Sequence, residues 1–325
     1  MRIAVDAMGG DHAPAQVVLG AAQAASEYGI DISLVGLPPA VQPLLDNHPR
    51  LQIVPCTQVI AMNEHPAQAV RAKPDSSICV CARLCKEGRA DGWTSAGNSG
   101  AVMAAAIFIQ GRIRGVERPA LGSIVPTKEG FAYFLDVGAN VDTKPEYLVR
   151  FAEMGAVYAR EMMGRPHPRV ALLSNGEEEG KGDQRVLETG QRLKSVLPGF
   201  IGNVEPKDIY NARADVVVTD GFVGNVAIKM AEATADFLFR NLREEIPKTM
   251  LGKLGGILIR PGVRQIRARI DWREFGGAPL LGIDGVAVVA HGRSDARAIK
   301  NAIRVTRDAV QNQLVGKIRA EVGKR

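Results

Sequence analysis

Short runs of β-branched and apolar residues alternate along this chain with longer, alanine-rich stretches of helical periodicity. The clearest expected strands cover residues 3–6, 93–96 and 215–219, and a helix is expected to begin at Pro14 and to end at Gly29. Strands that alternate with helices usually pair in parallel. The alternation therefore predicts an α/β fold with a mostly parallel sheet. No repeat or linker divides residues 1–325, so we expect a single domain.

Weaker patterns complete this outline. Asp75-Ser-Ser is expected to cap a helix that ends near Glu87, and Asp284-Gly285 indicates a hairpin within residues 280–291. Ser294 is expected to cap a final amphipathic helix. Further strands are expected at residues 32–35, 51–54, 121–125, 131–137 and 170–173, with helices at 145–163 and from about 223.

Residues 240–275 are expected to form a helical excursion from this domain. The segment 246–273 carries seven basic residues and one acidic residue, while the chain as a whole has a net charge of +6. Three glycines weaken helix formation there, which predicts a mobile tip between two helices. The tip is either part of a dimer interface or dips into an anionic membrane surface. Its apolar candidates for membrane contact are Leu254, Ile257 and Leu258.

Glycine makes up 35 of the 325 residues, and three glycine-rich turns each follow a strand and precede a helix. They are Val5-Asp-Ala-Met-Gly-Gly-Asp-His-Ala-Pro14, Ser95-Ala-Gly-Asn-Ser-Gly-Ala101 and Val218-Thr-Asp-Gly-Phe-Val-Gly-Asn-Val226. Glycine allows close approach of the backbone, and the first turn of a helix offers free N–H groups to an anion. None of the turns has the spacing of a dinucleotide fingerprint or a P-loop, so the turns predict a site for a small anion.

A fourth loop, Leu172-Leu-Ser-Asn-Gly-Glu-Glu-Glu-Gly-Lys-Gly-Asp183, also follows a strand. It is either a solvated acidic loop or a means of bringing Lys181, between two glycines, to an anion. The four cysteines (Cys56, Cys79, Cys81 and Cys85) are better explained as buried, reduced thiols than as metal ligands, because no histidine follows at zinc-finger spacing. The scarcity of aromatic residues, 5%, argues against a nucleic-acid partner.

The string Val5-Asp-Ala-Met-Gly-Gly-Asp11 resembles the N-terminal signature of the PlsX family, the bacterial phosphate acyltransferases of phospholipid synthesis. Other motifs of the family are matched, in order, by Ala96-Gly-Asn-Ser-Gly-Ala101, Asp136-Val-Gly-Ala-Asn140, Gly176-Glu-Glu-Glu-Gly-Lys-Gly182, Thr219-Asp-Gly-Phe-Val-Gly-Asn225 and Gly276-Gly-Ala-Pro-Leu-Leu-Gly282. The similarity covers essentially the whole chain. The departures are Ser99 and Val223 in place of threonine, Ser174-Asn175 in place of Asn-Ile, and Asp183 in place of asparagine.

The resemblance implies a Rossmann-like, three-layer α/β fold, similar to the isocitrate and isopropylmalate dehydrogenase-like group, in a homodimer. It implies conversion of acyl-(acyl-carrier protein) and inorganic phosphate to acyl phosphate and free carrier protein, without a cofactor or metal. A membrane glycerol-3-phosphate acyltransferase would use the product. The expected location is the cytoplasm, with peripheral association at the inner face of the cell membrane; Asp6 also interrupts the start of the chain before a secretory signal could form.

Phosphate attack on a thioester requires positioning and oxyanion stabilisation rather than a covalent nucleophile of the enzyme. We expect Lys181 to neutralise phosphate and Asn225 to donate to the phosphate or the oxyanion; the alternative for Asn225 is a helix cap. His12 either contacts substrate or lies on the surface, and the strand-ending Asp6, Asp136 and Asp220 could simply cap neighbouring segments. The other expected phosphate or substrate contacts are Gly9, Gly10, Gly97, Asn98, Ser99, Gly100, Gly221 and Gly224.

Two other functions fit part of the pattern. One is a metal- and NAD-dependent dehydrogenase on a similar fold, although no adenine-binding motif is present. The other is a non-catalytic scaffold that holds carrier protein at the membrane. It would need the basic segments, which are residues 246–273 and residues 293–325 with nine basic and three acidic side chains, but neither Lys181 nor Asn225.

Overall fold

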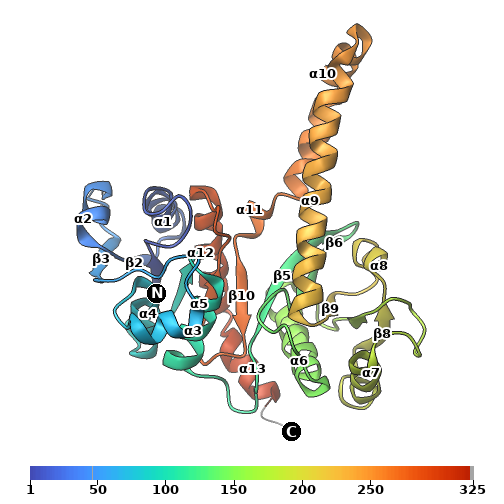
Figure 1. Cartoon of the computed structure of the whole chain (residues 1–325), viewed down its shortest axis with the longest axis horizontal. Helices are drawn as coiled ribbons and strands as arrows, with labels where there is room; N and C mark the ends of the chain where they lie inside the picture. The colour runs from blue at the N-terminus through green and yellow to red at the C-terminus, as the bar shows by residue number, and fades with distance from the viewer. Residues whose placement is uncertain (46, 323–325) are drawn as a thin grey trace.

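The computed structural model describes residues 1–45 and 47–322, and these residues form one eleven-stranded sheet in the order β3-β2-β1-β4-β11-β10-β5-β6-β9-β7-β8 (Figure 1). Seven neighbouring pairs are parallel, and three are antiparallel: β11–β10, β10–β5 and β5–β6. The prediction of a mostly parallel sheet is confirmed. The strands are β1 (Arg2–Asp6), β2 (Asp31–Gly36), β3 (Leu51–Pro55), β4 (Gly92–Ser95), β5 (Ala120–Thr127), β6 (Gly130–Leu135), β7 (Val170–Leu173), β8 (Phe200–Val204), β9 (Val216–Val218), β10 (Ala278–Leu281) and β11 (Ala287–Val289).

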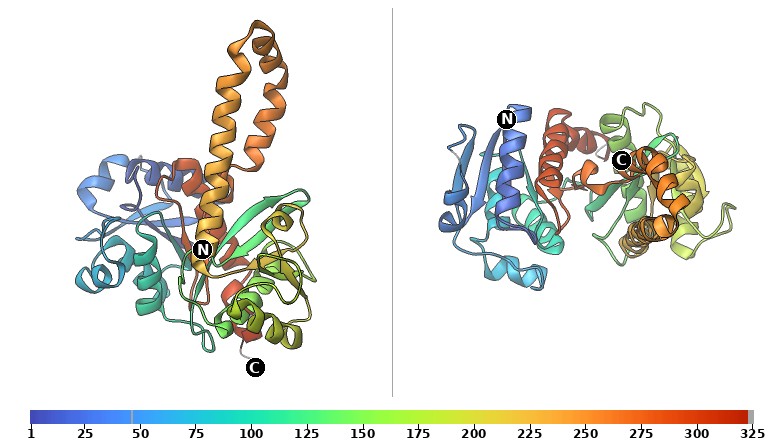
Figure 2. Two further views of the ribbon diagram at one scale, coloured as in Figure 1. Left: turned by 45° about the vertical axis from the view of Figure 1, so that its right-hand side comes forward. Right: turned by 90° about the horizontal axis from the view of Figure 1, so that it is seen from above.

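Helices cover both faces of this sheet, which gives the three layers of the expected fold (Figure 2). In the half built on β1, buried side chains of α1 and α12 form one core cluster, and those of α3, α4 and α5 form another. In the other half, α6 and α13 supply much of a third cluster. The helices are α1 (Ala15–Tyr28), α2 (Pro38–Val41), α3 (Pro66–Ala72), α4 (Ser77–Lys86), α5 (Ser99–Ala105), α6 (Pro145–Met162), α7 (Gln184–Val196), α8 (Pro206–Tyr210), α9 (Gly221–Glu245), α10 (Met250–Arg269), α11 (Trp272–Phe275), α12 (Ala296–Gln311) and α13 (Leu314–Val322).

The C-terminal helix differs from the sequence prediction at both its start and its middle. Asp295 caps α12 by accepting a hydrogen bond from the Ala298 backbone N–H, whereas the Ser294 hydroxyl donates to the His291 carbonyl. The helix then breaks before α13, where Gln313 has a φ of 52°. The single amphipathic helix expected here is thus two helices, with the apolar residues Ile299, Ile303 and Val310 on α12 and Leu314 and Ile318 on α13.

The predicted helical excursion is confirmed: α9 and α10 lie side by side and project as an arm from the body (Figures 1 and 2). The expectation that Gly252, Gly255 and Gly256 weaken helix formation at its tip is wrong, because all three lie inside α10. The turn is a short 3-10 helix at Ile246–Lys248, and a Cβ on Gly252 would lie 1.9 Å from the Ile246 carbonyl oxygen. Gly252 therefore lets α10 begin tightly against the turn.

The direction of the strands places the glycine turns at two edges of the sheet. The strands β1, β4 and β11 are parallel to one another, as are β6, β9 and β7. Three successive antiparallel pairings separate the two sets, so they run in opposite directions. The first two glycine turns therefore lie at one edge, and the third lies at the other.

Candidate functional site

The first glycine turn is held against the second by the buried carboxylate of Asp6, at the end of β1. Asp6 accepts hydrogen bonds from the Ser95 hydroxyl at 2.6 Å and from the Met8 N–H at 3.1 Å. Burial raises the pKa of Asp6, and the hydrogen bond from Ser95 opposes this effect. A Cβ on Gly9 would lie 2.6 Å from the Gly97 backbone nitrogen, so glycine permits the close approach of the two turns.

The loop after β11 completes this edge. The Asp11 N–H donates to the Gly292 carbonyl at 2.7 Å, and Gly10 has a φ of 106° against the same carbonyl. His12 is exposed. The structure therefore brings Gly9, Gly10 and Gly97 together and leaves His12 at the surface beside them.

Asn98 of the second turn is used within the fold. Its Oδ1 caps α5 by accepting from the Ala101 N–H at 3.1 Å. Its Nδ2 donates to the carbonyls of Ala61, Met62 and Glu64 at 3.3, 3.1 and 3.0 Å. Asn98 thus ties a distant loop to the turn. Of its neighbours, Ser99 is exposed, and Gly100 packs against Pro66.

Asp220 forms the base of the third turn. Its Oδ1 caps α9 by accepting from the N–H groups of Phe222 and Val223 at 3.0 and 2.9 Å. Its Oδ2 accepts from Arg185 at 3.3 Å. Because Asp220 is the cap, Asn225 is not; it lies in the second turn of α9 and is exposed.

The loop after β6 packs directly against this helix start. Asp136 is fully buried and accepts from backbone N–H groups of Leu121, Gly138, Ala139 and Asn140 and from the Asn140 amide. Burial raises the pKa of Asp136, while these donors oppose the effect. A Cβ on Gly224 would lie 1.8 Å from the Asp136 carbonyl oxygen. Gly221 and Gly224 therefore allow α9 to start in contact with this loop.

Lys181 lies in the exposed loop between β7 and α7, in the same half as Asn225. Asn203 fixes the loop by donating to the carbonyls of Glu178 and Lys181 at 3.0 and 3.1 Å. Arg185 then pairs with Asp183 at 2.7 Å and with Asp220 at 3.3 Å. Arg185 joins the Lys181 loop to the start of α9, and sequence reasoning missed it, although it follows the Gly-Lys-Gly string by three residues.

The two edges are connected by α9. Asn225, Lys229 and Glu232 have the i, i+4, i+7 spacing of one helix face, and Glu232 lies 3.9 Å from Arg293 of the loop after β11. This face of α9 is therefore turned toward the loop that contacts the first glycine turn. Lys181 and Asn225 lie near one end of this face, and Gly10 lies beyond the other.

His291 and Arg293 are further candidates that the sequence pattern did not single out. The Arg293 N–H donates to His291 Nδ1 at 3.3 Å, and the imidazole lies 5.0 Å from the Trp272 ring. Burial lowers the pKa of His291, and the charge of Arg293 lowers it further. The neutral ring, with Nδ1 accepting, would present an N–H at Nε2. The Gly285–His291 stretch carried only a hairpin signal.

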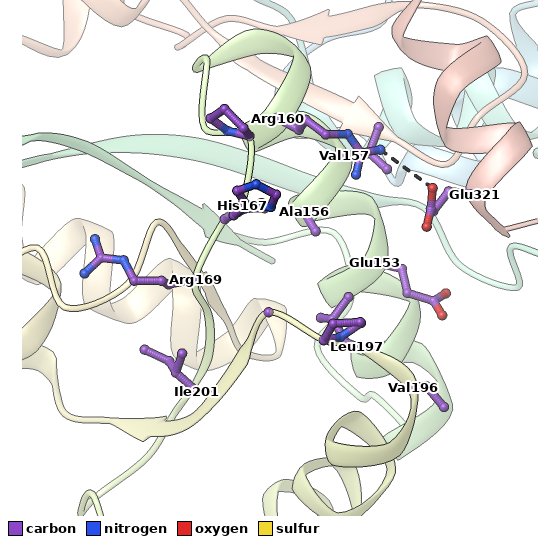
Figure 3. A pocket seen from close by; sticks show the side chains of 14 residues that line it. Glu153, Ala156, Val157, Arg160, His167, Arg169, Val196, Leu197, Ile201 and Glu321 are labelled. Carbon is purple, nitrogen blue, oxygen red and sulfur yellow. Dashed lines mark ion pairs between the residues drawn. The ribbon is translucent and has the colours of Figure 1, made fainter.

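A surface cavity of about 490 Å³ lies elsewhere, at the amino ends of β7 and β8 (Figure 3). Its lining includes Arg160, His167, Arg169 and Ile201, and Arg160 pairs with Glu321 at 3.6 Å. None of the predicted site residues lines it. Ligands of open α/β sheets bind at the carboxyl ends of strands, so the glycine turns, rather than this cavity, are the candidate site.

The four cysteines are free thiols. Cys56, Cys79 and Cys81 are buried, and Cys85 is partly buried. Within residues 1–45 and 47–322, no group of three or more histidine, cysteine, aspartate or glutamate side chains is arranged to hold a metal ion. Over the same residues, no helix is both long and apolar enough to cross a bilayer.

Solved structures with this arrangement define the fold class. A phosphotransacetylase from Streptococcus pyogenes superposes with a TM-score of 0.66 at 18% identity, over 96% of this chain and 94% of its own. A putative 4-hydroxythreonine-4-phosphate dehydrogenase from Salmonella typhimurium has a TM-score of 0.54 at 12% identity, over 94% of this chain and 99% of its own. The fold is thus shared by phosphotransacylases and a dehydrogenase-like group.

Sequence comparison is more specific. Residues 1–317 match the model of a family described as "Fatty acid synthesis protein". The phosphate acyltransferase of Heliobacterium modesticaldum is 49% identical, over 99% of this chain and 98% of its own length. That of Desulforudis audaxviator is 47% identical, over 99% and 96%. The chain therefore belongs to the phosphate acyltransferase family of enzymes, as the motifs had predicted.

Proposed function

We propose that this enzyme transfers the acyl group of acyl-(acyl-carrier protein) to inorganic phosphate. A phosphate oxygen attacks the thioester carbonyl, the new C–O bond forms, and the C–S bond breaks with its electron pair on sulfur. The products are acyl phosphate and the carrier thiol. A thiol pKa of about 8.5 makes the thiolate a good leaving group, and the reaction balances without a redox partner.

The observation that carries this proposal is that ion pairs hold the Lys181 loop against the start of α9. Arg185 bridges Asp183 and Asp220, at 2.7 and 3.3 Å. Asp183 and Asp220 each cap a helix, so the two helix starts are held together. Exposed Lys181 and Asn225 then supply a cation and an amide donor near helix N-termini, which favour anions.

In this mechanism, Lys181 neutralises the attacking phosphate, and Asn225 donates to the phosphate or to the oxyanion that develops on the thioester carbonyl. The first two glycine turns, with Gly9, Gly10 and Gly97, lie beyond the other end of the Asn225–Glu232 face of α9 and would supply further contacts to the phosphate or substrate. Removal of one oxyanion donor costs roughly 3 kcal/mol of transition-state stabilisation.

The test is an assay of purified enzyme with long-chain acyl-(acyl-carrier protein) and phosphate, in which hydroxylamine traps acyl phosphate. Phosphate-dependent trapping without NAD or added metal supports the proposal. An absolute requirement for NAD would favour the dehydrogenase function, and carrier binding without turnover would favour a scaffold.

Lys181→Met and Asn225→Ala should each reduce turnover at least tenfold, which is about 1.4 kcal/mol of barrier. Both side chains are exposed, so the melting temperature should remain near that of the wild type. Lys128→Met, in the exposed turn between β5 and β6 at the opposite edge of the sheet, is the matched control. Full activity in both variants would show that the site has been misassigned.

We further propose that the enzyme acts as a homodimer at the inner face of the cell membrane, and that a membrane glycerol-3-phosphate acyltransferase consumes its product. The support is chemical: an acyl phosphate has an apolar chain and a reactive anhydride, so release near the bilayer shortens its path. The exposed apolar side chains at the end of the arm suit such a contact; they are Leu254, Ile257 and Leu258.

A further inference from the structure

Helix α10 carries a one-sided line of positive charge. Residues 250–269 include no aspartate or glutamate. Lys253, Arg260, Arg264 and Arg267 are separated by seven, four and three residues, so they lie along one side of the helix. We call these four residues the cationic stripe. All four are exposed, and none forms an ion pair with another described residue, whereas Lys248 in the preceding turn pairs with Glu245 at 2.6 Å.

The lower end of the stripe lies beside the middle of α9, above the proposed active site. The helices α9 and α10 run side by side in opposite directions from the turn at Ile246–Lys248, and α10 ends opposite the middle of α9 (Figures 1 and 2). Just beyond this end, the Trp272 ring lies 5.5 Å from the Arg293 guanidinium, and Arg293 pairs with Glu232 of α9 at 3.9 Å. Glu232 is about 10 Å above Asn225 at about 1.5 Å of rise per residue, so the lower stripe stands about two helical turns or more above Asn225 along the arm.

Distance along the arm also distinguishes between an anionic membrane and an acidic protein as the partner of the stripe. Arg260 and Arg267 lie roughly 20 Å and 30 Å below the turn at about 1.5 Å per residue. The Debye length at physiological ionic strength is about 8 Å. A membrane that meets the tip of the arm is therefore several screening lengths away from the lower stripe. The uncompensated charge of Arg260, Arg264 and Arg267 consequently favours a protein partner that approaches the arm from the side.

We infer that the cationic stripe is the docking surface for an acidic helix of the acyl-carrier protein. This inference rests on the proposed function. Complementary charge would orient the carrier along α10 and speed its encounter. Docking there would hold the carrier beside the arm, on the side from which its thioester must approach the start of α9, where Asn225 lies. The apolar end of the arm remains available for a different contact.

The test is charge reversal by the triple variant Arg260→Glu, Arg264→Glu, Arg267→Glu. We expect at least a tenfold rise in KM for palmitoyl-(acyl-carrier protein), with kcat and KM for phosphate within twofold of the wild type. Carrier binding should weaken equally, and its salt dependence should become shallower. The matched control is Arg240→Glu, Arg243→Glu, Lys248→Glu, which reverses three charges on the same arm nearer the tip and should leave KM unchanged.

Unchanged KM and unchanged carrier binding in the stripe variant would overturn the inference. Loss of binding to phosphatidylglycerol vesicles at constant KM would assign the stripe to the membrane, and a changed sedimentation coefficient at constant KM would assign it to a second copy of the chain. Carrier binding is measured by fluorescence anisotropy without turnover. It therefore tests the stripe even if the wild-type enzyme makes no acyl phosphate, a result that would refute the proposed function instead.

Discussion

Replacement of Asn98 by serine separates a structural role from a phosphate-binding role in the second glycine turn. Serine retains an oxygen that can cap α5, but it loses the amide that donates to the carbonyls of Ala61, Met62 and Glu64. Two N–H bonds serve these three acceptors, and each lost hydrogen bond costs about 1 kcal/mol. We therefore expect Asn98→Ser to lower the free energy of unfolding by about 2–3 kcal/mol.

Asn98→Ala would also lose the cap, which adds about 1 kcal/mol to the expected loss. Urea unfolding can be followed by fluorescence, because Trp93 is fully buried in the adjacent strand β4. Ser76→Ala, which removes the cap of α4 and a hydrogen bond to the Cys79 thiol, is the control. A stability within about 0.5 kcal/mol of wild type (the ordinary scatter of surface substitutions), together with a raised KM for phosphate, would refute the structural role.

Three further outcomes are expected. Gly224→Ala should destabilise the protein by at least about 1–3 kcal/mol in denaturant unfolding, because its Cβ would lie 1.8 Å from a carbonyl oxygen, whereas Gly190→Ala, with its nearest neighbour at 3.8 Å, should not. His291 should titrate by NMR below the ordinary histidine pKa of 6.5. The neutral form of His291 is favoured in the folded protein, so its contribution to the free energy of unfolding is complete above pH 6.5 and is lost as the pH falls through the lower native pKa. An NMR titration midpoint above 6.5 would contradict the burial of the ring. Replacement of Leu254, Ile257 and Leu258 by glutamate should abolish binding to anionic liposomes but spare turnover in solution. Loss of the dimer together with activity would instead show that these residues form a dimer interface.

Sequence patterns predicted the local features of this fold well. The strands and glycine turns follow from short-range propensities, and Gly29 does end α1, with a φ of 66°. The arm was also predicted, but its tip was not, because the contact of Gly252 with Ile246 decides where the turn lies. Local propensity disfavoured helix at Gly252, whereas its close approach to the Ile246 carbonyl oxygen fixes the tight start of α10.

The site was predicted less completely, because its remaining contacts join residues far apart in the chain. Asn98 bonds carbonyls 34 to 37 residues away, and no local pattern indicates those partners. The bridge from Arg185 to Asp220 spans 35 residues. His291 approaches the first glycine turn only because β11 inserts beside β4. Such juxtapositions depend on strand order, which the spacing of motifs does not contain.

That insertion has a consequence for how the chain folds on the ribosome. When residues 1–110 have been synthesised, β4 still lacks its neighbour β11, and the core of α1 still lacks α12. At about 5–20 residues per second, these elements appear on the order of ten seconds or more later. The nascent N-terminal half therefore waits with an open sheet edge, which is a template for aggregation. Folding of this enzyme should consequently depend on chaperones that shield such an edge until roughly the last fifty residues emerge, with α12 and the strand before it.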